Sequence, residues 1–69
     1  MPYTLHGSIL SETAKALKFE IEKINEDSLD EPQVEWFPFS QIKSIMKSKS
    51  QELDNITVSD WIMDAKGLL

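Results

Sequence analysis

The stretch Ala16–Ile24 (ALKFEIEKI) constrains the fold of this chain more than any other segment. From Leu17 to Ile21 every second residue is apolar, and the residues between them are charged. This period of two is typical of a β-strand with one buried face, whereas an amphipathic helix needs apolar residues spaced by three and four. A helix starting at Ser11 competes, because Ser11 can cap it and the composition suits a helix. The spacing favours the strand, so we expect a sheet protein.

A second strand is predicted around the run WFPFSQI, which begins at Trp36. Its apolar residues occupy both alternating sets of positions, so the strand is either covered on both faces or carries an exposed binding face. Pro38 lacks a backbone donor and favours the end of the strand or an edge. We expect Trp36 to pack in the core with Trp61, and Phe37 and Phe39 to form an exposed aromatic face.

The other elements follow from turn residues and helix signals. We predict strands at Tyr3–Leu10, with a bulge at Gly7, at Ile42–Met46 and at Ile56–Val58, a loop at Asn25–Pro32, a turn at Lys47–Asn55, and a two-turn helix capped by Ser59 and ended by Gly67. The predicted fold is α+β and mostly β. It is a small curled antiparallel sheet of three to five strands with one short C-terminal helix, in a single domain over residues 1–69.

Composition limits the compartment and the chemistry. The chain has 69 residues and no cysteine, which excludes disulfides and thiolate metal sites. The N-terminal residues lack the pattern of a signal peptide, and no apolar run is long enough to cross a bilayer. We therefore expect a soluble cytoplasmic protein without a membrane partner, and leave self-association open.

The negative charge of the chain is concentrated in one segment. Twelve acidic residues outnumber seven lysines, giving a net charge of −5, and arginine is absent. This balance disfavours a reader of duplex DNA and favours an acidic surface that meets a basic partner. Five carboxylates lie within ten residues without a lysine among them: Glu26, Asp27, Asp30, Glu31 and Glu35. The functional interpretation is a docking patch, including mimicry of nucleic acid, and the simpler alternative is a solvated hairpin tip.

No catalytic, cofactor or metal site is predicted. His6 is the only histidine and has no neighbouring residues in the sequence that would complete a triad or a zinc site. Asp27, Asp30 and Glu31 lack the glycine turn and closing glutamate of a calcium loop. An alternative to the docking patch is nucleic-acid binding through Lys43, Lys47 and Lys49, with Phe37 and Phe39 stacking on bases.

Four fragments in this order carry a family resemblance: SETAKALKF, EWFPFSQI, ITVSDW and KGL. The chain resembles a family of small proteins encoded by bacteriophages and mobile elements, with the pattern E-T-x-K-A-x-x-F, W-x-P-x-S-Q-I and V-x-x-W-x-x-x-K-G-L. The family usually has a basic residue where this chain has Phe39, which argues against a phosphate contact there. No chemistry is assigned to the family, so the resemblance implies origin and fold.

From these observations we expect a non-catalytic interaction module of phage type, acting in the cytoplasm of a host cell. Its predicted partner is a host or phage protein that handles nucleic acid, such as a defence system that it would modulate or inhibit. The alternative function is an accessory protein that binds single-stranded nucleic acid.

Overall fold

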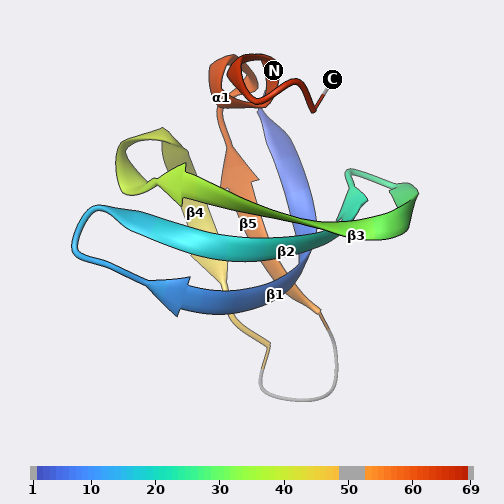
Figure 1. The fold of residues 1–69 in the computed structure, drawn as a ribbon, viewed down its shortest axis with the longest axis horizontal. Helices are drawn as coiled ribbons and strands as arrows, with labels where there is room; N and C mark the ends of the chain where they lie inside the picture. Colours follow the sequence, from blue (N-terminus) through green and yellow to red (C-terminus); the bar gives the residue numbers. More distant parts are fainter. Residues whose placement is uncertain (1, 49–52, 69) are drawn as a thin grey trace.

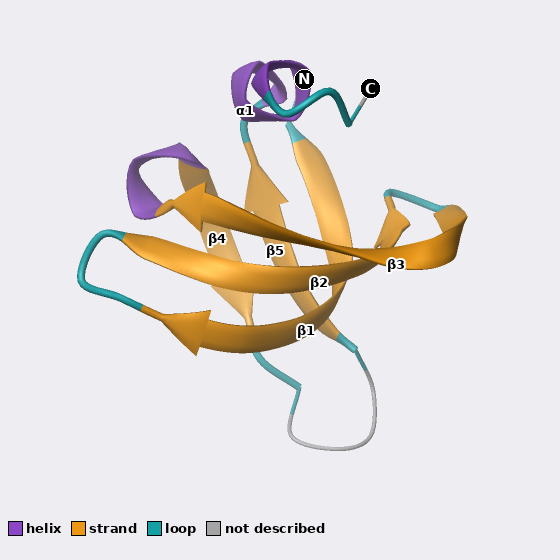
Figure 2. Cartoon of the chain, viewed as in Figure 1, coloured by secondary structure: helices purple, strands orange, loops and turns teal. Residues whose placement is uncertain are grey.

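The chain forms one five-stranded antiparallel sheet and a short C-terminal helix (Figures 1 and 2). The computed structural model describes residues 2–48 and 53–68. The elements are β1 (Tyr3–Glu12), β2 (Ala16–Ile24), β3 (Asp27–Pro38), the 3₁₀ helix η1 (Phe39–Gln41), β4 (Ile42–Met46), β5 (Asp54–Val58) and α1 (Asp60–Ala65). The strand order is β3-β2-β1-β5-β4. The prediction of a mostly-β fold with one short C-terminal helix is confirmed, and β2 and β4 have the predicted bounds.

The curl of the sheet originates in β1, which pairs with β2 along its length and with β5 through its first half. Figure 1 shows β2, β3 and the second half of β1 crossing in front of β4 and β5, while the first half of β1 runs beside β5. The register of β1 against β2 shifts between His6 and Gly7, and again between Ile9 and Ser11. A Cβ on Gly7 would lie 1.8 Å from the backbone oxygen of Glu20, so only glycine fits this close approach. The predicted bulge is confirmed in position only: the register shifts beside Gly7, but the extra residue is Glu22 on β2.

The core lies inside the curled sheet and is built from alternating strand residues. Its buried apolar side chains are Leu5, Leu17, Phe19, Ile21, Phe37, Ile56, Val58, Ile62 and Met63. The three from β2 are the alternating residues that predicted the strand. Tyr3, Ile9, Ile24, Leu29, Phe39, Ile42 and Leu68 pack against this cluster and are partly buried.

Helix α1 covers the core through Ile62 and Met63, and the prediction that Trp61 packs in the core is wrong. Ser59 caps the helix by accepting a hydrogen bond from Ile62 N at 3.3 Å, and Gly67 ends it with φ of 67°. Both ends of the helix are therefore where the sequence predicted them. Trp61 is 62% exposed, because only one side of this two-turn helix faces the core and that side carries its two neighbours.

The predicted loop Asn25–Pro32 is also corrected. The turn between β2 and β3 consists of Asn25 and Glu26 alone, and β3 already begins at Asp27 opposite Ile24. The register then jumps from Ser28 to Gln33 on β3 while β2 advances from Lys23 to Ile21. Residues 29–32 are thus inserted opposite a single residue of β2, which makes a large irregular bulge in the strand.

Candidate partner-binding surface

The acidic hairpin, which we define as Glu26, Asp27, Asp30 and Glu31, is held in place by a short polar connection to β1. Asn25, at the turn, has φ of 55°, a left-handed conformation that asparagine tolerates better than most residues. Its side-chain Oδ1 accepts a hydrogen bond from Thr4 N at 3.0 Å, and its own N donates to Thr4 O at 2.7 Å. Asn25 is therefore joined to Thr4 of β1 through both its side chain and its backbone N–H.

All four carboxylates of the acidic hairpin are exposed. In residues 2–48 and 53–68, no ion pair joins any of them to a lysine. Their charge is therefore presented to solvent without local neutralisation. The four carboxylates repel one another, but the repulsion is weak because water and dissolved ions screen exposed charges.

Two shallow hollows border the acidic hairpin. One is polar and is lined by Thr4, His6, Asn25, Glu26 and Asp27. The other is lined by Glu22, Lys23, Ser28, Leu29, Asp30, Pro32 and Leu53. Acidic residues outnumber the single lysine in these linings, so the hollows extend the negative surface away from the turn.

His6 has a structural contact in the first hollow. Its Nδ1 lies within hydrogen-bond distance of Asn55 Oδ1. This contact joins the outward faces of β1 and β5. The partner is an amide, which cannot activate the imidazole as the carboxylate of a catalytic triad would.

Glu35, the fifth carboxylate predicted for this patch, lies elsewhere. It pairs with the buried Phe19 of β2 and so points to the core side of β3. One carboxylate oxygen lies 3.5 Å from Lys66 Nζ, and the other accepts a hydrogen bond from Gln33 Nε2 at 3.1 Å. Glu35 thus connects β3 to the end of α1, where it is partly neutralised.

The predicted exposed face of Phe37 and Phe39 is wrong. Phe37 has 0% exposure and lies opposite the buried Leu17, and Phe39 is partly buried against the core. Because side chains alternate along a strand, burying Phe37 turns Trp36 outward. Trp36 is 41% exposed, so the prediction that it shares a core with Trp61 is also wrong. Lys18 Nζ lies 5.9 Å from the Trp36 ring centroid, on the outward face.

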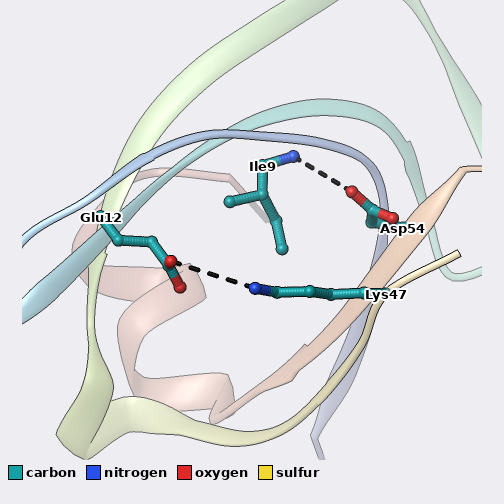
Figure 3. A network of polar contacts seen from close by, with 4 residues as sticks. All are labelled: Ile9, Glu12, Lys47 and Asp54. Atoms are coloured by element: carbon teal, nitrogen blue, oxygen red, sulfur yellow. Dashed lines mark hydrogen bonds and ion pairs between the residues drawn. The ribbon is translucent and has the colours of Figure 1, made fainter.

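The predicted lysine group lies at the other edge of the sheet. Lys43 on β4 and Lys47 just beyond it are exposed, and Lys49 lies outside the described residues. Lys47 Nζ is 4.0 Å from a Glu12 carboxylate oxygen (Figure 3). In the same view Ile9 N donates to Asp54 Oδ2 at 3.5 Å. Lys43 and Lys47 lie on β4 and directly after it, and β4 is farthest from β3 in the strand order. Strand pairing therefore does not bring these lysines beside the aromatic residues of β3.

In comparisons with known proteins, no family model, curated protein or solved structure matches the chain. In the part of the chain that the structure describes, no helix has the length and apolar character needed to span a membrane.

Proposed function

We propose that this protein is a non-catalytic interaction module whose acidic hairpin docks on a basic surface of a partner protein. The observation that carries the proposal is the exposure of four carboxylates at one end of the sheet, with no described lysine paired to them. Such a surface raises the rate of encounter with a basic partner more than it sets the final affinity.

The class of partner follows from the same chemistry. Proteins that handle nucleic acid present basic surfaces to phosphate, and a group of exposed carboxylates offers those surfaces a competing ligand. The two bonds between Asn25 and Thr4 support this role, because they limit the motion of the turn that carries the charges. With the resemblance to phage proteins, this points to a host or phage protein that handles nucleic acid, such as a defence system that the module inhibits.

The test removes charge from the acidic hairpin while keeping the side-chain shapes. The variant Asp27→Asn, Asp30→Asn and Glu31→Gln should keep the thermal midpoint of the wild type, because all three side chains are exposed. Its association with a lysine-rich peptide, and with a basic partner recovered from host lysate, should be slower and less dependent on salt.

The matched control removes the same number of charges outside the acidic hairpin, by Glu12→Gln, Glu20→Gln and Asp64→Asn. Under the proposal this control keeps most of the wild-type association rate, although both triple variants have the same net charge. Equal rates and equal salt slopes for the two variants would show that only the total charge matters, and would place the interface elsewhere.

A second candidate function is suggested by Trp36, which is exposed beside Lys18 on the outward face. An aromatic ring next to a lysine can stack on a base and contact a phosphate, as in proteins that bind single strands. In a Trp61→Phe background, single-stranded oligonucleotides should then quench the fluorescence of Trp36. Unchanged fluorescence at high oligonucleotide concentration would remove this candidate.

A further inference from the structure

The sheet has two edges of opposite charge. Within residues 2–48 and 53–68, no strand pairs with the outer side of β3 or of β4. Strand β3 contains four acidic residues and no lysine, while Ile42–Lys47, covering β4 and the next residue, contains two lysines and no acid. Unpaired strand edges present backbone donors and acceptors that can extend a sheet with another strand.

Both edges also carry apolar side chains that the fold leaves partly uncovered. On β4, Ile45 lies opposite the buried Ile56 and faces the core side, yet it is 37% exposed. Its neighbour Met46 is 66% exposed. On β3, Val34 and Trp36 are 42% and 41% exposed. A strand added at either edge would remove part of this apolar surface from water.

Charge disfavours pairing of either edge with its own copy. Two β3 strands paired antiparallel about a two-fold axis through the middle of Asp27–Pro38 would place Asp30 opposite Glu35 of the other copy. Two β4 strands paired about Ile45 would place Lys43 opposite Lys47 of the other copy. Like charges directly opposite each other destabilise strand pairs, whereas opposite charges stabilise them.

We propose that copies of this chain associate edge to edge, with β4 of one copy adding to β3 of the next. The occupant of each free edge is then a second copy, selected by the complementary charges of the two strands. Because the two surfaces differ, the contact is heterologous, and repetition gives a closed ring or an open chain. This assembly goes beyond the proposed function, since it uses the strand edges. Three of the four acidic residues of β3, Asp27, Asp30 and Glu31, also belong to the acidic hairpin, so the charge changes that test the assembly are made at the β4 edge and leave the acidic hairpin intact.

Single-cysteine variants test which edges meet, and the absence of native cysteine makes the labelling specific. Val34→Cys reports on β3, Ser44→Cys reports on β4, and Ala14→Cys in the exposed β1–β2 turn is the control. With a short bis-maleimide cross-linker, a mixture of the β3 and β4 variants should give a dimer yield several-fold above that of either variant alone. Mixtures that contain the Ala14→Cys control should not. A yield from the mixture no higher than from the separate variants would overturn the proposal.

Sedimentation velocity over a concentration series gives the independent measurement. The wild type should show concentration-dependent association, and Lys43→Glu with Lys47→Glu should weaken it by about tenfold. The control Lys15→Glu with Lys23→Glu changes the net charge equally and should weaken it less. A wild type that stays monomeric at every concentration overturns the proposal. It does so even if a lysine-rich peptide binds at β3, because the partner at that edge would then be another molecule. Equal weakening by the two variants overturns it as well.

Discussion

The substitution Gly7→Ala tests the packing of β1 against β2 at the position where the sheet curls. An added Cβ would lie 1.8 Å from Glu20 O, 2.9 Å from Glu20 C and 3.2 Å from Glu22 N. All three are backbone atoms, so no side-chain rotation relieves the contact. Since real Cβ atoms essentially never approach other atoms within 3.0 Å, the two strands must separate by over an ångström.

The cost of that separation can be estimated from its parts. Overpacking of a well-packed site costs about 1–3 kcal/mol. Weakening two backbone hydrogen bonds adds about 0.5–1.5 kcal/mol each. The expected loss for Gly7→Ala is therefore roughly 2–6 kcal/mol. A chain of 69 residues has a total stability of roughly 3–10 kcal/mol, so this loss should remove a large fraction of it.

Urea unfolding followed by circular dichroism measures this loss, and Gly67→Ala is the matched control. Gly67 has φ of 67° and nothing within 4 Å of an added Cβ, so its substitution should cost only the left-handed backbone penalty of about 1–2 kcal/mol. The reasoning is refuted if Gly7→Ala is no more destabilising than Gly67→Ala.

Three further predictions concern side chains and are measured by the same urea titrations. Phe37→Ala should cost about 3–5 kcal/mol and Trp36→Ala about 1 kcal/mol or less, and similar losses would contradict the assigned faces of β3. Ser59 Oγ donates to Gln41 Oε1 at 2.6 Å and caps α1, so Ser59→Ala should cost about 1–2 kcal/mol while Ser59→Thr is tolerated. Asn25→Ala should be more destabilising than Asn25→Gly by about 1 kcal/mol, because both lose the bond from Thr4 but only glycine accepts the positive φ without strain. A glycine variant as unstable as the alanine variant would show that the side-chain bond alone matters.

The sequence predicted those parts of the fold that depend on local patterns. The alternation in β2 identified both the strand and its buried face, and Ser59 and Gly67 marked the ends of α1. The strand order was not predictable, because alternation shows which face of a strand is buried without showing which strand lies beside it. The pairing of β1 with β5, which lie far apart in the chain, is therefore known only from the structure.

The site was predicted less well, for two physical reasons. Asn, Asp and Pro in residues 25–32 are typical of a loop, but pairing with β2 and the bonds between Asn25 and Thr4 extend the strand almost to the turn. Around Trp36 and Phe37 both faces are apolar, so composition cannot decide which residue is inside. The smaller Phe37 fits opposite Leu17 in the core, and Trp36 turns outward. The exposure of the acidic hairpin was predictable, because runs of carboxylates are rarely buried.

The double pairing of β1 has a consequence for the order of folding. Strands β1, β2 and β3 follow one another in the chain. Pairing of β5 with β1, in contrast, closes a loop that contains β2, β3 and β4. Closing so long a loop is entropically unfavourable, so contacts between β1 and β2 should form in the transition state before those with β5. Truncation of Phe19 on β2 should then mainly slow folding, and truncation of Ile56 on β5 should mainly accelerate unfolding. If a chevron analysis shows that truncating Ile56 slows folding more than truncating Phe19, the order is reversed. The pairing of β1 with β5 would then form the folding nucleus.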